Sequence, residues 1–248
     1  MGQADVQLAV DGKTHLTPVG LPRLARRILG LTQRVKDFAH AYRTHPQLGP
    51  LIARLPGLRV PLSVTPFEAL TWAITGQQIS LGAAIFLRRR LIEAAGLRHS
   101  AGLACHPDAE RMMALGATDL HQAGFLRAKA QALSLLSHQV AANRLPLETW
   151  TATMPIDDLR AQLLRLRGIG PWTVDYTLLR GFGWLDGSLH GDAAVRRKLQ
   201  RLLGSTAALT EGFTRNWLAQ FSPWRALVAA HLWSTPDEFL PAANSRGQ

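Results

Sequence analysis

A Gly-Ile-Gly-Pro-Trp stretch occupies residues 168–172, between two segments whose leucines recur at helical spacing. Glycines let a ligand approach the backbone, and Pro171 suits the first position of a helix. The loop therefore presents backbone amides at a helix N-terminus, which favours an anion such as a phosphate. The same residues also suit an ordinary helix–helix turn with a glycine cap, and two glycines alone favour that simpler interpretation.

Asp192 is the candidate carboxylate for chemistry, at the start of the stretch DAAVRRKL. A carboxylate beside a reacting centre stabilises positive charge that develops there. An aspartate before an amphipathic segment is also typical of a helix N-cap, and without further context we favour the cap. Asp175 and Asp186 are the competing carboxylates in the same region.

The charge balance favours a polyanionic partner. The chain has 28 Lys and Arg against 17 Asp and Glu, a formal charge of +11. Nucleic acid is the first expectation, an acidic membrane surface the second, and a charge spread over solvated faces the alternative. Hydrophobic residues make up 47% and charged residues 18%, which indicates a globular chain.

Cysteine content and hydropathy exclude several classes. Cys105 is the only cysteine, so the chain has no internal disulfide and no cysteine-based zinc or iron–sulfur site. No apolar run approaches the roughly 20 residues of a membrane span, and the N-terminus lacks the pattern of a signal peptide. We therefore expect a cytoplasmic protein with no membrane partner.

The elements that must position these residues are mainly helical. A helical apolar pattern begins at Leu21, and Thr65, Pro66 and Glu68 predict a helix start with a capping box. That helix is interrupted by TGQQIS and followed by a second amphipathic stretch ending at Gly96. Further helices are expected at 107–116, 118–122, 125–142, 156–166, 171–182, 191–203, 210–220 and 223–233.

The N-terminal segment differs from the rest. Val6, Leu8 and Val10 alternate before a turn at Asp11-Gly12, which predicts a small β-hairpin. We therefore expect a mainly α fold of two packed helical subdomains. The expected parts are a hairpin at 1–20, one subdomain at 21–66 and 185–240, a second at 67–184, and a flexible tail at 241–248.

Three motifs in order resemble the helix–hairpin–helix DNA glycosylase superfamily. LRGIGPWTVDYTLLRG, at 166–181, is similar to its hairpin, and FEALTWAITGQQIS, at 67–80, resembles the segment that carries a residue wedged into DNA. PWRALVAAHLW, at 223–233, resembles a C-terminal helix of the AlkA-type branch, DNA-3-methyladenine glycosylase II. The resemblance covers roughly Arg26 to Pro236. The larger N-terminal β-domain of that branch is not matched, so the short hairpin would be its remnant.

The resemblance implies a role for Asp192, which follows Gly170 by 22 residues as the catalytic aspartate of that superfamily does. The 21–66 and 185–240 subdomain would then carry the catalytic residue. Its carboxylate would stabilise positive charge on the sugar and orient a water. Lyases of the superfamily place a Schiff-base lysine where this chain has Trp172, so hydrolysis without lyase activity is implied.

The resemblance also implies an aromatic base pocket. A flipped alkylated purine carries positive charge, and aromatic faces attract it. The positions that match, or could line such a pocket, are Trp172, Tyr176, Trp233 and Trp72. Core packing is the alternative for each ring. Ser234 stands where the best-known member of the branch has an aromatic residue, which implies a more open pocket.

Contacts with DNA follow from the same resemblance. Gln78 matches the wedge residue, with Gln77 as the alternative. The expected phosphate contacts are Gly168, Gly170, Thr173, Arg127, Lys129, Arg196 and Arg197. The hairpin carbonyls of Leu164, Leu166 and Ile169 match a monovalent cation site for Na⁺ or K⁺, and no cofactor is required for the chemistry. The arginines at 88–90 are expected on a solvated face.

The implied function is a monomeric glycosylase that acts on alkylated bases in double-stranded DNA. The candidate lesions are 3-methyladenine, 7-methylguanine, ethenoadenine, hypoxanthine, and N1-methyladenine or N3-methylcytosine. Three alternatives stay open. They are a lyase or a glycosylase of the same superfamily for deaminated, oxidised or mismatched bases, a non-catalytic DNA-binding module, and a helical bundle for protein interaction.

Overall fold

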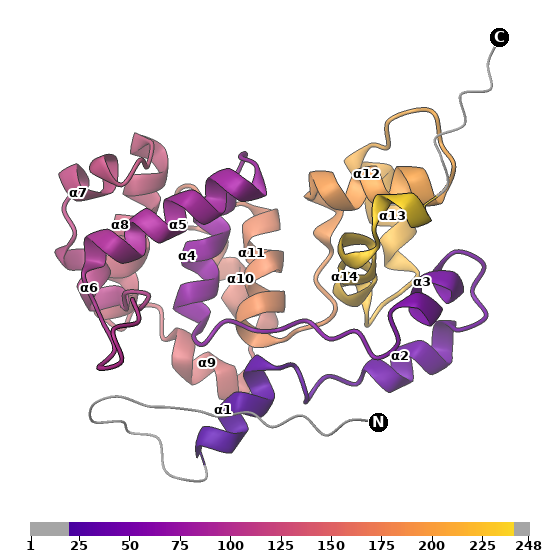
Figure 1. Cartoon of the computed structure of the whole chain (residues 1–248), viewed down its shortest axis with the longest axis horizontal. Coiled ribbons are helices and arrows are strands. Elements are labelled where there is room, and N and C mark those ends of the chain that lie inside the picture. Colours follow the sequence, from indigo (N-terminus) through magenta and orange to yellow (C-terminus); the bar gives the residue numbers. More distant parts are fainter. Residues whose placement is uncertain (1–19, 241–248) are drawn as a thin grey trace.

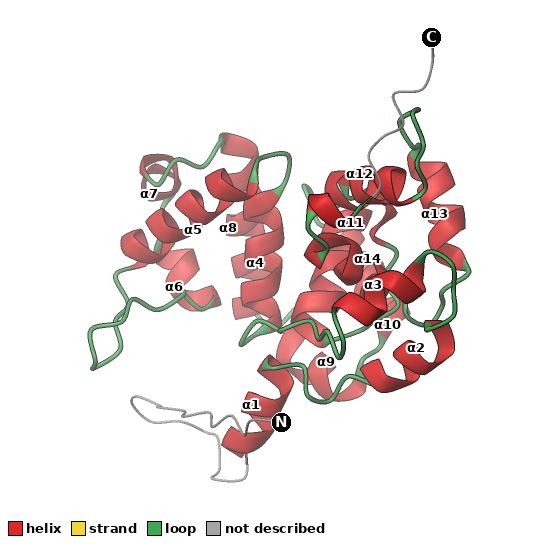
Figure 2. Cartoon of the chain, turned by 45° about the vertical axis from the view of Figure 1, so that its right-hand side comes forward, coloured by secondary structure: helices red, strands yellow, loops and turns green. Residues whose placement is uncertain are grey.

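The computed structural model describes residues 20–240, and this part of the chain is helical (Figures 1 and 2). Its only extended pairing is one isolated antiparallel bridge between Arg98 and Ala104. The prediction of a mainly α fold is confirmed. The expected hairpin at 1–20, apart from Gly20, and the expected tail at 241–248 lie outside the described residues. No helix within 20–240 combines the length and apolar character needed to cross a bilayer.

Short connections join the helices. The first group is α1 (Gly20–Ile28), α2 (Val35–Tyr42), α3 (Leu48–Arg54), α4 (Pro66–Gly76), α5 (Leu81–Ala95), α6 (Ala109–Ala114), α7 (Ala117–Gln122) and α8 (Arg127–Ala141). The second group is α9 (Leu147–Thr153), α10 (Ile156–Leu164), α11 (Pro171–Thr177), α12 (Ala193–Leu202), α13 (Glu211–Ala219) and α14 (Arg225–Ser234). A π-helical turn η1 (Leu178–Phe182) continues α11, and short 3₁₀ turns are η2 (Leu189–Gly191) and η3 (Asp237–Phe239).

The start of α4 follows the sequence prediction. The Thr65 hydroxyl accepts the backbone N–H of Glu68 at 3.1 Å, and Pro66 occupies the first turn. The Glu68 carboxylate reaches back to the N–H of Val64, at 3.1 Å, one residue earlier than a capping box requires.

The continuous helical pattern after Leu21 is split in the structure. Gly30, with φ +67°, lies between α1 and α2. The break is held by the buried amide of Gln33, which donates to the Val60 carbonyl at 2.7 Å and accepts the Val60 N–H at 2.9 Å. Turn-type backbone bonds take the place of helical ones here, from the Gly30 N–H to the Arg27 carbonyl at 2.9 Å and from the Gln33 N–H to the Gly30 carbonyl at 3.1 Å. The chain becomes helical again at Val35.

Two hydrophobic clusters organise the described helices. In Figure 1, α4 to α8 lie on the left, and α2, α3 and α12 to α14 lie on the right. The first cluster fills the left side, with buried side chains that include Leu70, Ile74, Leu133 and Leu136. The second fills the right side and includes Phe38, Leu51, Val195, Leu199 and Leu227.

Helix α11 contributes to both clusters. Val174, in α11, and Leu178, at the start of η1 that continues it, are fully buried in the first cluster. Trp172 and Tyr176, on the other face of the same helix, pack against the second cluster. The helix that follows the glycine loop therefore presents its aromatic residues at the seam between the two clusters.

Close packing of η1 against α4 fixes the position of α11, which η1 continues. A Cβ atom on Gly181 would lie 3.1 Å from both the Cα of Pro66 and the Cβ of Ala69. The contact leaves no room for a side chain because its partners are a backbone atom and a helix-bound methyl group.

We predict that Gly181→Ala lowers the free energy of unfolding by about 1–3 kcal/mol, because the added methyl overpacks this contact. Gly82→Ala is the matched control, since Gly82 lies in α5 with nothing within 4 Å of its added Cβ. The control should be neutral or gain up to about 1 kcal/mol. Denaturant unfolding of both variants measures the difference, and equal stabilities would contradict the close packing.

Candidate active site

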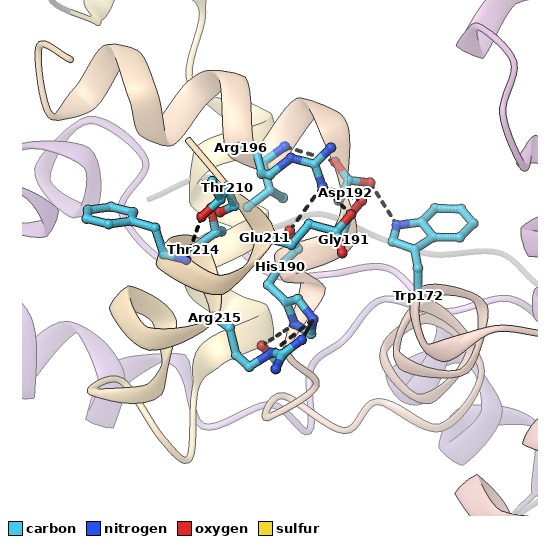
Figure 3. A network of polar contacts seen from close by, with 12 residues as sticks. Trp172, His190, Gly191, Asp192, Arg196, Thr210, Glu211, Thr214 and Arg215 are labelled. Atoms are coloured by element: carbon cyan, nitrogen blue, oxygen red, sulfur yellow. Dashed lines mark hydrogen bonds and ion pairs between the residues drawn. The ribbon is translucent and has the colours of Figure 1, made fainter. Parts of the chain in front are cut away.

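Asp192 receives three N–H donors from three helices (Figure 3 shows the first). The indole of Trp172, from α11, donates to Oδ2 at 2.9 Å. The indole of Trp233, from α14, donates to Oδ1 at 3.1 Å. The backbone N–H of Val195, in the first turn of α12, donates to Oδ1 at 2.9 Å. Asp192 is thus the N-cap of α12, and it also joins α12 to α11 and α14.

All three donors on Asp192 are neutral. Arg196 lies close by, but its guanidinium donates to the Gly191 carbonyl at 2.9 Å and to Glu211 at 3.0 Å (Figure 3). Within residues 20–240, no cation forms an ion pair with Asp192. Its negative charge is therefore held in place by dipoles and is not neutralised, which suits a carboxylate that faces a cationic reacting centre.

The two competing carboxylates do have cationic partners. Asp186 forms a two-pronged pair with Arg225, at 2.7 and 2.9 Å, and accepts the Ser222 hydroxyl at 2.9 Å. Asp175 is buried and pairs with Arg160. Burial raises the pKa of Asp175, while the charge of Arg160 opposes that rise. Both residues hold the structure together, and Asp192 is left as the carboxylate available for chemistry.

The predicted aromatic residues lie together beside Asp192. The rings of Trp172 and Tyr176 are 5.3 Å apart between centroids, and those of Tyr176 and Trp233 are 6.2 Å apart. The Trp72 indole donates to the Tyr176 hydroxyl at 2.8 Å. Burial raises the pKa of that phenol, which therefore stays neutral. The structure brings all four predicted pocket residues to one place.

Arg88 joins this cluster, which the sequence did not predict. Its guanidinium lies 5.6 Å from the centre of the Trp72 ring and forms an ion pair with Glu68. The expectation of a solvated face is wrong for Arg88, which is partly buried, whereas Arg89 and Arg90 are exposed. Nothing in the triplet of arginines distinguishes the first, because its partners come from α4.

The two glycines of the loop differ. Gly168 adopts φ +90°, in the region that favours glycine. Gly170 is extended, with φ −105°, and a Cβ there would meet nothing within 4 Å. Gly170 is the N-cap of α11 and supplies no side-chain cap. The first glycine therefore shapes the turn, and the second leaves open space in front of the helix N-terminus.

The two candidate wedge residues, in the turn between α4 and α5, differ in their contacts. Both N–H groups of the Gln77 side chain are engaged, with the Gly168 carbonyl at 2.9 Å and the Thr173 hydroxyl at 2.8 Å. Gln78 is exposed at the tip of the turn, with φ +55°. Of the two, Gln78 is therefore the one whose side chain is exposed and makes no hydrogen bond within the described residues.

The predicted phosphate contacts fall into two groups. Lys129 donates to the Thr75 carbonyl at 2.8 Å, and burial lowers its pKa. Arg196 is bound as described above, and the Thr173 side chain is buried. Arg127 and Arg197 are exposed and enter no hydrogen bond or ion pair within the described part of the chain. The same part holds no group of three or more His, Cys, Asp or Glu suited to a metal ion.

Comparison with known families assigns the chain to a superfamily. Residues 71–220 match the model of the HhH-GPD superfamily of base excision DNA repair proteins. The chain belongs to this superfamily. The HhH-GPD match includes the turn between α4 and α5, residues 77–80, which we call the wedge turn after the predicted wedge residue. It also includes the glycine loop, Asp192 and three of the four aromatic positions.

Relatives place the chain more closely within the HhH-GPD superfamily. It is 31% identical over 230 residues to DNA-3-methyladenine glycosylase 2 of Escherichia coli, covering 88% of this chain and 77% of that protein. It is 29% identical over 214 residues to a probable bifunctional transcriptional activator/DNA repair enzyme AlkA of Mycobacterium tuberculosis, covering 85% of this chain and 41% of that one.

A solved HhH-GPD structure shows the same fold. The 3-methyladenine DNA glycosylase Mag1 of Schizosaccharomyces pombe, in complex with abasic DNA, superimposes with a TM-score of 0.70 at 20% identity. The match covers 80% of this chain and 95% of Mag1.

We predict that Asp186→Asn lowers the free energy of unfolding by about 1.5–3 kcal/mol, because it removes a charged partner from Arg225. Asp192→Asn should cost about 1 kcal/mol, because its amide oxygen still caps α12 and accepts the Trp233 N–H, while its amide nitrogen can no longer accept the Trp172 N–H. Denaturant unfolding of the two variants measures the contrast. A larger loss for Asp192→Asn would show that Asp192 serves mainly to stabilise the fold.

Proposed function

We propose that this chain is a monofunctional DNA glycosylase that removes alkylated, cationic purines flipped out of duplex DNA. The observation that carries the proposal is Asp192, a carboxylate with only neutral donors, set beside the rings of Trp172, Tyr176 and Trp233. Membership of a base excision repair superfamily supports the same assignment.

The proposed reaction breaks the bond between the sugar C1′ and the base nitrogen. The bonding electrons leave with the base, so an alkylated cationic purine departs as a neutral molecule and needs no general acid. Positive charge develops on the sugar, and the Asp192 carboxylate stabilises it. Water then adds its oxygen to C1′ and releases a proton, for which Asp192 is the acceptor.

The geometry leaves Asp192 able to do this while bound to its donors. Oδ1 accepts two N–H groups and Oδ2 accepts one, so Oδ2 retains an acceptor site for the sugar or the water. The donors fix the carboxylate before the substrate arrives, and no reorganisation is required during the reaction.

The aromatic cluster selects a cationic base. The faces of Trp172, Tyr176 and Trp233 attract an electron-poor purine by stacking and cation–π contact. Arg88 places positive charge beside Trp72, but its ion pair with Glu68 offsets that charge. We expect lesions of the 3-methyladenine and 7-methylguanine class to be the preferred substrates.

The glycine loop is the proposed site for a DNA phosphate, through the amides of Gly168, Gly170 and Thr173. Arg127 and Arg197 are exposed cations available for further phosphates, and the excess charge of +11 strengthens the attraction. Lys129 and Arg196 contribute charge but are already engaged with the protein. We expect the enzyme to act as a monomer on double-stranded DNA.

The carbonyls of Leu164, Leu166 and Ile169 are proposed to hold Na⁺ or K⁺ beside that phosphate. Neutral carbonyl oxygens suit a weakly bound alkali cation. The Leu166 carbonyl accepts the Ile169 N–H at 3.1 Å and retains a second lone pair, so it fits this role. The bound ion would add positive charge at the phosphate, while the chemistry stays with Asp192.

We predict that Asp192→Asn reduces base release from methylated DNA by roughly 100-fold or more, because the charge that stabilises the sugar is lost. Its affinity for undamaged duplex DNA should be unchanged, since the hairpin is intact. Chromatography of released bases from dimethyl-sulfate-treated DNA, together with a binding titration at low salt, measures both.

Other outcomes separate the alternatives. A wild type that binds DNA and releases no base is a non-catalytic DNA-binding module. A covalent adduct trapped by borohydride would indicate a lyase and would overturn the hydrolytic assignment, which rests on Trp172 standing where lyases of the superfamily place a lysine. A wild type with no affinity for DNA at low salt would favour a protein-interaction bundle.

We predict that Trp172→Phe lowers kcat for base release about tenfold with little change in KM, because the ring remains but one hydrogen bond to Asp192 is lost. Trp217→Phe is the control, since that ring packs on Phe221 at 4.7 Å, away from the aromatic cluster. Single-turnover kinetics measure the step directly. An unchanged kcat would show that the indole N–H does not position Asp192.

A further inference from the structure

The turn that carries Gln78 holds an unfavourable backbone conformation. Gln78 has φ +55°, in the left-handed region, which costs a non-glycine residue roughly 1–2 kcal/mol. Its side chain is exposed and has no partner within the described chain. Contacts on neighbouring residues must therefore hold the turn in this shape.

Two side chains anchor the end of α4, immediately before Gln78. Lys129, from α8, donates to the Thr75 carbonyl at 2.8 Å. Gln77 donates to the Gly168 carbonyl at 2.9 Å and to the Thr173 hydroxyl at 2.8 Å. The orientation of the Gln77 amide is fixed by chemistry, because the Gly168 carbonyl is only an acceptor and so must face the nitrogen.

The two partners of Gln77 lie on opposite sides of the glycine loop. Gly168 enters the loop with φ +90°, and Thr173 is in the first turn of α11. The Gln77 side chain therefore contacts both sides of the glycine loop, and Gln77 directly precedes Gln78. Its two hydrogen bonds connect the loop to the wedge turn, although the two segments are about 90 residues apart in sequence.

We propose that Gln77 is a positioning residue that couples phosphate binding at the glycine loop to insertion of Gln78 into the duplex. The inference rests on the proposed function, since it assigns the loop to phosphate and Gln78 to the gap left by a flipped base. Gln77 itself contacts neither the phosphate nor the gap in the DNA. It fixes the distance between the glycine loop and Gln78, so that a loop bound to a phosphate places Gln78 at the damaged base step.

Coupling of this kind gives the enzyme preference for damaged DNA over undamaged DNA. Binding through phosphates alone is independent of damage. Insertion of Gln78 adds affinity where a base is missing from the stack. If Gln77 holds Gln78 in position relative to the loop, loss of its two hydrogen bonds lowers the affinity gained from Gln78 insertion more than the affinity gained from phosphate contacts.

The test compares affinity for a duplex containing a tetrahydrofuran abasic analogue with affinity for the same duplex undamaged. Gln77→Met keeps the length of the side chain and removes both donors. We expect the preference of the enzyme for the abasic duplex to fall roughly tenfold, as for the loss of about one net hydrogen bond. Gln131→Met, on the exposed face of α8, is the matched control and should leave the preference unchanged.

A double-mutant cycle separates positioning from a merely structural role. Gln78→Ala removes the wedge side chain, so Gln77→Met should have little further effect in the Gln78→Ala background. Additive losses would show that Gln77 acts independently of Gln78 and would overturn the inference. An equal loss of affinity for both duplexes would also overturn it, because Gln77 would then support the phosphate site alone.

Thermal unfolding shows whether Gln77→Met is folded. A folded variant whose preference for the abasic duplex is unchanged refutes the proposal. Base release is measured separately on methylated DNA. A wild type that prefers the abasic duplex but releases no base would refute the proposed function and leave the role of Gln77 to be decided by the cycle.

Discussion

The hydrogen bonds to Asp192 are the constraint on which the rest of the site depends. The carboxylate begins α12, and the same two oxygens receive indoles from α11 and α14. Because α11 packs into the first hydrophobic cluster through Val174, and its continuation η1 does so through Leu178, Asp192 links the two clusters at their seam. A shift of either cluster would break a bond to the carboxylate, so the position of the site and the packing of the helices determine each other.

Helix α11 links binding to chemistry over a short length. Its N-terminus faces the open space before Gly170, and its second residue, Trp172, contacts Asp192. The first two residues of α11 therefore connect the proposed phosphate site to the carboxylate that we propose as the reacting group. Close packing of Gly181 against α4 keeps this helix from sliding, and α4 ends in the turn that carries Gln78.

Much of this site could be predicted from local sequence. Thr65 and Pro66 mark a helix start. Asp192 stands out in the sequence both as the N-cap of a helix and by its spacing after the glycine loop. Contacts between distant residues left no such signal. Arg88 stands in a run of three arginines, and only the fold brings it to Glu68 and Trp72. At the break near Gly30, Gln33 meets Val60, 27 residues later, and the apolar pattern that begins at Leu21 carries no sign of this contact.

The treatment of charge explains why Asp192 differs from its neighbours. A guanidinium beside a carboxylate stabilises the fold but cancels the field that a cationic sugar would feel, as Arg225 does for Asp186. Indole and amide N–H groups hold the carboxylate by their dipoles and leave its full negative charge in place. The arrangement forgoes the larger stabilisation of an ion pair, and it retains at this position the negative charge that the reaction we propose for Asp192 requires.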